Sequence, residues 1–494
     1  MLTRLKVDGF KNLVDVDLRF GPFTCIAGGN GTGKSNVFDA ISFLSDLADV
    51  TFAEAIARVR TEDGDRLDGE DASGVDDIFY RGGDSAKEKS VRFECEFLLA
   101  REGEDDLGQL AQAKSTFLKY TLELKRRDDD PFSPNPLELV HEDLTYIRKG
   151  EARAALPFAS VKSGWFDSVF LNERTGGPYI STDQAKGRVL LHQDGRNEDG
   201  KKKRGRAVER DSLKLPRTVL SSATASESPT VLLARREFRS WRRLQLEASA
   251  LRRSDRFAAE SRLGEDGAHM AKTLYSLVSR RADGSVDDDD EVLLELASRV
   301  GELVDDVHRV TIDVDEKRQR LTLIGVGNDG VSHSARALSD GTLRFLALSI
   351  VELDVNAEVI CLEEPENGIH PTRIEAMMRL LQDIAMDVSM PLTEDNPLRQ
   401  VIVNTHSPGV VRACTPESLV VVERRPLSRI EASRRTVRFG FLAETWRHLA
   451  EPEEHPALLG DLLAFLEFQP RVRTDGVTPR VEDYVGDQLK LAID

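Results

Sequence analysis

"FTCIAGGNGTGKSN", residues 23–36, is the stretch that decides the fold of this chain. Its first five residues are mostly apolar and predict a fully buried strand. A glycine-rich loop follows, and apolar side chains then recur at helical spacing from Val37 to Ala48. Strand, glycine loop and helix in this order are the setting that a phosphate-binding loop requires. The sequence therefore predicts an α/β fold.

Residues 28–35 match the pattern G-x-x-x-x-G-K-[ST]. Glycines let backbone N–H groups approach phosphate oxygens, and the start of the helix adds its positive dipole. We expect Lys34 to reach the β- and γ-phosphates of ATP and Ser35 to ligate Mg²⁺. The alternative, a chance glycine-rich turn, is disfavoured by the flanking strand and helix. The predicted nucleotide contacts are Gly28, Asn30, Gly31, Thr32, Gly33, Lys34, Ser35 and Asn36.

Composition narrows the class of protein. The chain has 494 residues, 31% of them charged, and a net charge of −18, which predicts a self-repelling surface and argues against extensive coating by nucleic acid. A local basic patch is still compatible with this charge. No run of 18 apolar residues occurs, and charges interrupt residues 1–20, so we expect a cytoplasmic protein with no membrane partner. Four dispersed cysteines indicate a reducing compartment and no zinc knuckle: Cys25, Cys95, Cys361 and Cys414.

Shifts in pattern along the chain divide it into five predicted parts. Residues 358–362, 371–386 and 399–405 have the order strand, helix, strand, which implies parallel strands with right-handed crossovers. No heptad pattern persists for three or four repeats, so a long coiled coil is not expected. The parts are a first half of the nucleotide-binding head (1–108), a β-rich insertion (109–230), an arginine-rich helical lid (231–305), a second half of the head (306–450) and a helical tail (451–494).

A second candidate site begins at "VICLEEPE", residues 359–366. The pattern places Glu363 and Glu364 at the carboxyl end of a buried strand, where open α/β sheets present their ligands. Glu363 is expected to hold Mg²⁺ through water, and Glu364 to orient or deprotonate the attacking water. Acidic turns after strands are common, and it is the phosphate loop elsewhere in the chain that favours the functional interpretation.

Two further motifs have both a structural and a functional interpretation. In "ALSDGTLRFLALSIVEL", residues 337–353, Ser339 and Gly341 stand at a predicted helix start that suits a γ-phosphate. An ordinary N-cap at Ser339 explains the same residues. His406 follows an apolar strand in "NTHSP", and an isolated histidine there is more often structural than catalytic.

The order of these motifs resembles that of an ABC-type P-loop ATPase head. The closest resemblance is to the RecF/SMC/OLD branch, especially to compact AAA family ATPases of bacterial anti-phage defence systems. "EEPENGIHP", "THSP" and "GFKNL" are typical of that branch, and the likeness covers residues 1–50 and 335–425. It implies a mixed sheet with flanking helices, here interrupted by the β-rich insertion and the lid.

The resemblance also implies how ATP is used. Two heads would form a homodimer, or a higher oligomer, around ATP and Mg²⁺. Ser339 and Gly341 would close on the ATP of the partner subunit, His406 would contact the γ-phosphate, and residues 367–370 would lie at the dimer seam. The catalytic set would be Lys34, Glu364 and His406, with Ser35 and Glu363 at the metal.

The sequence departs from this family pattern in three places. Glu363 stands where many ABC heads have Asp, which puts direct metal ligation in doubt. No glutamine occurs between Asn36 and Gly108, where the Q-loop glutamine would be sought, and Gln109 and Gln112 remain candidates. Residues 418–429 lack the Asp-x-Asp cluster of a TOPRIM nuclease, so we expect no nuclease activity.

The segment from Arg235 to Arg256 carries eight arginines against three acids and is the candidate contact for DNA. Pairing of these arginines with acidic residues elsewhere is the alternative. The leading hypothesis is an ATP-hydrolysing switch that controls DNA engagement or a partner effector, a nuclease or toxin encoded nearby, in anti-phage defence. Two rivals are a RecF-like repair or recombination ATPase and an assembly platform in which ATP cements an oligomer around a toxin or nuclease.

Overall fold

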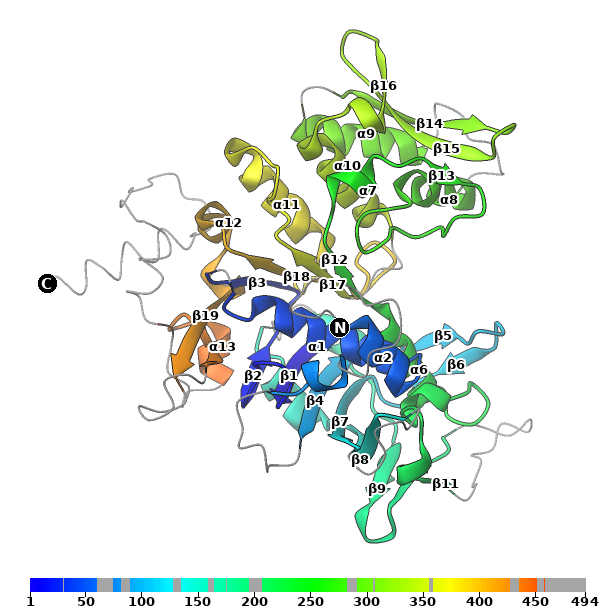
Figure 1. The fold of residues 1–494 in the computed structure, drawn as a ribbon, viewed down its shortest axis with the longest axis vertical. Coiled ribbons are helices and arrows are strands. Elements are labelled where there is room, and N and C mark those ends of the chain that lie inside the picture. The colour runs from blue at the N-terminus through cyan, green and yellow to red at the C-terminus, as the bar shows by residue number, and fades with distance from the viewer. Residues whose placement is uncertain are drawn as a thin grey trace, which may run out of the picture.

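The computed structural model of the chain consists of two large sheets and a smaller helical lobe (Figure 1). The central sheet lies between the lobe at one end of the molecule and the large antiparallel sheet at the other. The structure describes residues 1–29, 31–59, 74–80, 89–127, 135–158, 164–174, 176–194, 207–281, 291–304, 307–354, 359–426, 435–450 and 457.

The central sheet is mainly parallel, and only its last pair, β19 and β20, is antiparallel. Alternate residues of β17 face opposite sides: Val359 and Cys361 belong to one hydrophobic core, Ile360 and Leu362 to the other. Burial of both faces requires the unbroken apolar runs seen in the sequence. The strands predicted around 23–27, 358–362 and 399–405 are confirmed. In pairing order, the described strands are β12 (Trp241–Leu244), β17 (Val359–Glu363), β18 (Gln400–Thr405), β3 (Phe23–Ala27), β19 (Leu419–Pro426) and β20 (Arg435–Phe441).

The large antiparallel sheet includes β2, a half-buried strand near the N-terminus. Residues 109–230, which the sequence sets apart as an insertion, contribute β7 to β11 to this same sheet, because β7 pairs along its length with β4. These strands therefore extend the sheet that the N-terminal strands begin, and they do not form a sheet of their own. In pairing order, the described strands are β11 (Val208–Asp211), β10 (Arg188–Leu191), β9 (Ile180–Asp183), β8 (Leu137–Tyr146), β7 (Phe117–Arg126), β4 (Ser90–Leu98), β1 (Leu2–Asp8) and β2 (Val16–Arg19).

Two helices join the large antiparallel sheet to the central sheet. The apolar residues of α1 (Lys34–Leu47) and α6 (Pro229–Ser240) lie in one core with inward-facing residues of both sheets. Phe43 of α1, for example, packs 6.1 Å between ring centres from Phe93 of β4. Because α1 begins at the phosphate loop, this core fixes the position of the loop. The neighbouring helices α2 (Phe52–Arg58) and α3 (Gly74–Asp77) are short.

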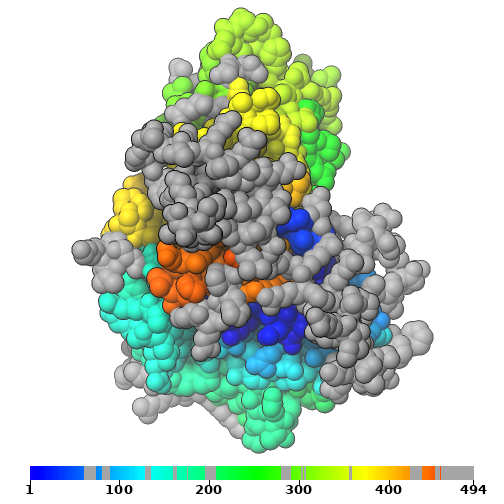
Figure 2. Space-filling model, turned by 90° about the vertical axis from the view of Figure 1, so that its left-hand side faces the viewer, coloured from blue at the N-terminus to red at the C-terminus, as the bar shows by residue number. Residues whose placement is uncertain are grey.

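The second core lies on the opposite face of the central sheet and extends into the lobe. Within this part, β14 and β15 pair along their length as an antiparallel hairpin. In Figure 2 the lime and yellow segments of the lobe lie at one end of the visible face and the teal strands at the other. The elements of this part are α7 (Ala248–Leu251), β13 (Asp255–Arg256), α8 (Met270–Arg281), α9 (Glu291–Leu303), β14 (Arg309–Asp315), β15 (Arg320–Val326), β16 (Ser332–Ser334), α10 (Asp340–Leu353), α11 (Ile374–Ile384) and α12 (Pro408–Ala413).

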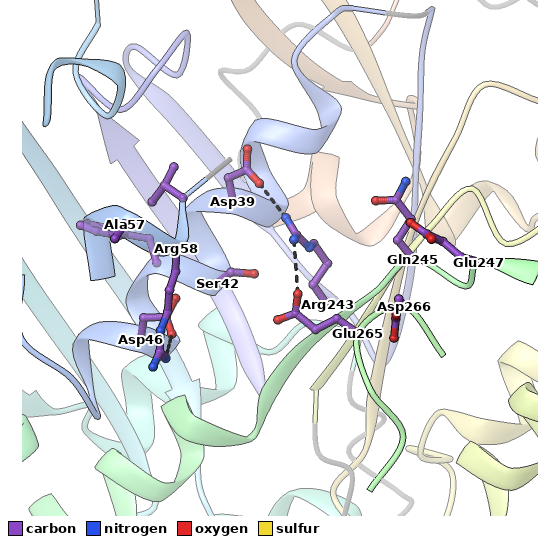
Figure 3. Close-up of a pocket in the computed structure, with 12 residues that line it drawn as sticks. Asp39, Ser42, Asp46, Ala57, Arg58, Arg243, Gln245, Glu247, Glu265 and Asp266 are labelled. Carbon is purple, nitrogen blue, oxygen red and sulfur yellow. Dashed lines mark hydrogen bonds and ion pairs between the residues drawn. The ribbon is translucent and has the colours of Figure 1, made fainter. Parts of the chain in front are cut away.

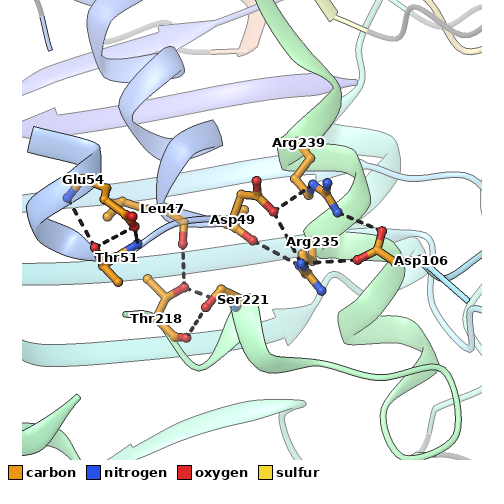
Figure 4. Close-up of polar contacts among 10 residues, drawn as sticks. Leu47, Asp49, Thr51, Glu54, Asp106, Thr218, Ser221, Arg235 and Arg239 are labelled. Carbon is orange, nitrogen blue, oxygen red and sulfur yellow. Dashed lines mark hydrogen bonds and ion pairs between the residues drawn. The ribbon is translucent and has the colours of Figure 1, made fainter. Parts of the chain in front are cut away.

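The arginine-rich segment, Arg235 to Arg256, is only partly helical. It is helical in α6 and α7, but between them β12 forms the edge of the central sheet beside β17. Trp241 and Leu244 are buried there, which places a short strand where arginine-rich helix was expected. Arg235 and Arg239 form ion pairs with Asp49 (Figure 4). These pairs match the alternative interpretation, in which arginines neutralise acids of the same chain.

The remaining described elements lie around the two sheets. They include an exposed hairpin, β5 with β6, which contacts α6. The predicted tail, 451–494, lies outside the described residues except for Ala457. In the described part of the chain, no helix has the length and apolar character needed to cross a membrane. These elements are β5 (Glu102–Glu104), β6 (Leu110–Gln112), α4 (Lys149–Ala155), α5 (Trp165–Val169) and α13 (Trp446–Ala450).

Candidate functional site

The phosphate loop runs from the end of β3 to the start of α1. Gly33 has φ 100°, and a Cβ built on it would lie 2.4 Å from Nδ2 of Asn12, so only glycine fits. Nζ of Lys34 donates to the carbonyl oxygens of Gly28 (2.7 Å) and Gly29 (2.8 Å). The ammonium group therefore points into the loop. Asn30 lies outside the described residues.

The start of α1 fits an anion. No side chain of the described residues caps it, although the N–H of Asn36 donates to the carbonyl oxygen of Gly33 at 3.1 Å, and an uncapped helix start favours an anion. Oγ of Ser35 lies 3.4 Å from Oε2 of Glu363, so these two predicted metal ligands meet. Two other side chains that were predicted to contact the nucleotide form hydrogen bonds within the protein. Asn36 donates to Oδ1 of Asn12 (2.7 Å), and the Thr32 hydroxyl donates to the carbonyl of Gly29 (2.8 Å).

Glu364 and His406 meet at the carboxyl ends of β17 and β18. Oε1 of Glu364 lies 2.7 Å from Nδ1 of His406, and Oε2 accepts from Nδ2 of Asn367 at 2.9 Å. The backbone of Glu364 has φ 44°, and its N–H donates to the carbonyl of Asn404 at 3.0 Å. The predicted base and the histidine predicted to contact the γ-phosphate thus form one pair, held by a left-handed turn at the strand end.

A third carboxyl group, that of Glu366, is buried close to this pair. It accepts a hydrogen bond from the hydroxyl of Thr405, and burial raises its pKa. Burial also lowers the pKa of Lys34, and the carboxylates of Glu364 and Glu366 oppose that change. Motif matching missed Glu366 because it follows the two acids of the motif in what looked like an ordinary turn.

The edge strand β12 supplies a glutamine that sequence reasoning also missed. Leu244 pairs with Leu362 in parallel register, so Gln245 stands level with Glu363. Gln112 lies in the exposed β5–β6 hairpin, and Gln109 immediately precedes β6. Gln245 thus lies at a strand end level with the predicted metal ligand. A search limited to residues 36–108 could not find it.

A pocket of about 920 Å³ adjoins the site between α1, α2 and the end of β12 (Figure 3). The guanidinium group of Arg243 lies among its acidic residues. It contacts Asp39 at 3.0 Å and Glu265 at 3.4 Å, and its Nε lies 4.0 Å from Oε1 of Glu363. Asp39 also pairs with Lys11 at 2.6 Å, which ties the "GFKNL" turn to α1. Buried charges therefore hold α1 against β17, the strand that ends at Glu363.

In the described part of the chain, the Ser339–Gly341 motif does not contact the phosphate loop. Ser339 caps α10 by accepting from the amide of Thr342, and its hydroxyl contacts no described residue outside its own helix. The start of α10 packs instead on the loop after the two acids: a Cβ on Gly341 would lie 3.3 Å from the carbonyl oxygen of Gly368. Asp340 forms an ion pair with Arg252.

The residues present fit Mg²⁺ bound together with a nucleotide. Across the described ranges, no group of three or more His, Cys, Asp or Glu side chains is placed to hold a metal alone. Ser35 and Glu363 provide a hydroxyl and a carboxylate oxygen side by side. Mg²⁺ in nucleotide enzymes is typically held by one or two protein oxygens, substrate phosphates and water.

A protein-family model matches residues 23–154 and 189–412, which include every motif of the site except the "GFKNL" turn. Its description is "AAA domain, putative AbiEii toxin, Type IV TA system". The chain belongs to this family. Membership in this AAA family, together with the strand order and the phosphate loop, confirms the ATPase head of ABC type that the sequence resembled.

Solved SMC head domains show a distant likeness. A head bound to the C-terminal winged-helix domain of ScpA is 12% identical, with 90% of this chain and 98% of that chain covered and a TM-score of 0.42. The head from Thermotoga maritima is 13% identical (89% and 98% covered, TM-score 0.34). A Pyrococcus furiosus head with an extended coiled coil is also 13% identical (92% and 99%, TM-score 0.43). No relative was found among curated proteins.

Proposed function

We propose that this protein is an ATP-hydrolysing switch that works as a homodimer around ATP and Mg²⁺. One observation carries the proposal: the carboxyl ends of neighbouring parallel strands bring Glu363, Glu364 and His406 beside the loop of Lys34 and Ser35. Ligands of open α/β sheets bind at this edge. The groups found there are those needed to bind phosphates, hold a metal and activate water.

Each group has a proposed task. Lys34 exchanges the carbonyl oxygens of its loop for phosphate oxygens when ATP binds. Ser35 and Glu363 hold Mg²⁺, which neutralises phosphate charge. Glu364 orients or deprotonates the attacking water, and His406, now paired with Glu364, turns to the γ-phosphate. Gln245, beside Glu363, takes the place of the Q-loop glutamine.

The position of α10 supports the homodimer. Ser339 and Gly341 lie at a helix start that does not contact its own phosphate loop in the described residues. In a two-fold symmetric pair they would close on the ATP of the partner subunit. The loop 367–370 contacts Glu364 through Asn367 and packs against Gly341, so it would lie at the seam and link both faces of the sandwich.

The ATP cycle is proposed to control a separate effector, a toxin or nuclease. The family description names a toxin of a type IV toxin–antitoxin system, which supports a place in defence, including anti-phage defence. Direct contact with DNA has less support, because Arg235, Arg239, Arg243 and Arg252 form ion pairs within the chain. Arg253 and Arg256, which end the segment, are exposed, as are Arg236 and Arg239.

Substitution of Glu364 tests this proposal. Glu364→Gln keeps the shape of the side chain but removes the base, so it should bind ATP and hydrolyse it at least about a hundredfold more slowly. Slow hydrolysis should accumulate an ATP-dependent dimer, measured by light scattering. Lys34→Ala is the matched control and should bind no ATP and remain monomeric. Wild-type turnover by Glu364→Gln, or equal ATP affinity of Lys34→Ala and wild type by calorimetry, would contradict the site assignment.

A further inference from the structure

Glu366 has no task in the proposed ATP cycle, yet it occupies an unfavourable place. Its residue is 7% exposed, and one carboxyl oxygen accepts from the hydroxyl of Thr405. The other oxygen, Oε2, is buried and has no hydrogen-bond partner among the residues that the structure describes. Burying a carboxyl group costs free energy unless hydrogen bonds compensate for the lost water. The bond to Thr405 is therefore the contact that explains where this side chain points.

Thr405 connects that carboxyl group to both sides of His406. It is the last residue of β18 and is fully buried. Its hydroxyl oxygen accepts from the backbone N–H of Ser407 at 2.9 Å, across the histidine. Its carbonyl oxygen accepts from the N–H of Gly28 in the phosphate loop at 3.3 Å. One threonine thus links Glu366, the backbone around His406 and the start of the loop.

We propose that Glu366 is a positioning residue that sets the orientation of His406 through the hydroxyl of Thr405. A hydroxyl has a single hydrogen, and donation of this hydrogen to Glu366 turns the lone pairs of Thr405 toward the amide of Ser407. The hydrogen bond between Ser407 and the Thr405 side chain then closes the turn that carries His406. Without the acceptor at 366, the hydroxyl is free to rotate, and the bond to Ser407 loses its direction.

The inference rests on the proposed ATPase function, in which His406 contacts the γ-phosphate. It also agrees with the local electrostatics, because burial raises the pKa of Glu366 and so favours its uncharged form near the phosphates. The acceptor oxygen of Glu366 has a natural substitute. Glutamine offers a carbonyl oxygen in the same place, whereas leucine fills a similar volume without an acceptor.

The test compares Glu366→Leu with Glu366→Gln. Glu366→Leu should lower kcat about tenfold or more, because a small displacement of a catalytic group is enough for such a loss, while its Kd for ATP stays within about twofold of wild type. Glu366→Gln should recover most of the turnover. Thr405→Val, which removes the hydroxyl and keeps the side-chain shape, should repeat the loss if Glu366→Leu folds poorly.

A double-mutant cycle with His406→Ala distinguishes positioning from a general structural role. If Glu366 acts through His406, adding Glu366→Leu to His406→Ala should cost no further activity. Multiplicative losses, wild-type turnover by Glu366→Leu, or an equal loss of ATP affinity and turnover would each overturn the inference. Wild-type protein in the same assay separates the two proposals: absence of ATP hydrolysis there would contradict the proposed function itself.

Discussion

Gln245 and Gln112 allow a residue-scale test of the metal site. Gln245 follows β12 and stands level with Glu363, whereas Gln112 lies in the exposed β5–β6 hairpin. Gln245→Ala should raise the Mg²⁺ concentration for half-maximal ATP hydrolysis by about tenfold, as loss of an outer partner of a metal ligand does. Gln112→Ala is the control and should leave this concentration unchanged. Equal Mg²⁺ dependence of the two variants would remove Gln245 from the site.

Among single residues, the sequence best predicts those site residues that stand next to one another in a local motif. Residues 28–35 and the pair Glu363 and Glu364 are local motifs, and the structure places them together. Gln245 and Glu366 depend instead on pairing between distant segments: β12 lies beside β17 although more than 100 residues separate them. Spacing along the chain carries no signal for such a contact.

At the scale of elements, α1 and α6 are joined by the cluster in Figure 4. Arg235 donates to the carbonyl oxygen of Ala48, just after α1, and pairs with Asp49 at 3.4 Å. Its side chain is 16% exposed, so Arg235→Ala should lower the free energy of unfolding by about 1–2 kcal/mol, measured by urea denaturation. Arg318→Ala, whose partner is Asp315 and whose side chain is 81% exposed, should change it by less than about 0.5 kcal/mol.

The same pair of variants bears on DNA binding. If Arg235 contacted DNA and did not stabilise the α1–α6 junction, Arg235→Ala would be as stable as Arg318→Ala. It would also lose affinity for DNA in a salt-dependent manner. That result would contradict the structural role argued for this arginine and restore the lid hypothesis.

The strand β12 shows why an element can be predicted wrongly. Its apolar residues, Trp241 and Leu244, are three apart, which is helical spacing, and α6 directly precedes them. Whether four residues at a sheet edge form a strand depends more on pairing with the neighbouring strand, here β17, than on their own sequence pattern. The longer strands β3, β17 and β18 were predictable because burial of both faces demands an apolar run.

At the scale of the whole molecule, the two halves of the head meet inside one sheet. β3 from the N-terminal half lies between β18 and β19 from the C-terminal half. The sequence predicts parallel strands from the order strand, helix, strand, but it contains no signal for their order in the sheet. The continuous antiparallel sheet was missed for the same reason, since gaps rich in turn residues separate strands that are neighbours in space.

Glu142 links that antiparallel sheet to the segment leading into α6, and it should make stability depend on pH. The carboxyl group on β8 is fully buried and accepts from the amides of Val219 and Leu220 and from the hydroxyl of Tyr120. Burial raises its pKa from 4.5 to about 7, although these donors oppose the rise. Between those values the folded protein keeps a proton that the unfolded chain has released.

Stability should therefore fall as pH rises from about 4.5 to about 7, with no further contribution from Glu142 above that range. The full effect of this one group is about 3 kcal/mol. Glu142→Gln cannot ionise, so its free energy of unfolding, measured in urea at about pH 5 and about pH 8, should fall by about 3 kcal/mol less than that of wild type. Other titrating groups contribute equally to both proteins and cancel in this difference. Parallel pH dependence of the two proteins would show that Glu142 is already ionised in the fold, held by its three donors.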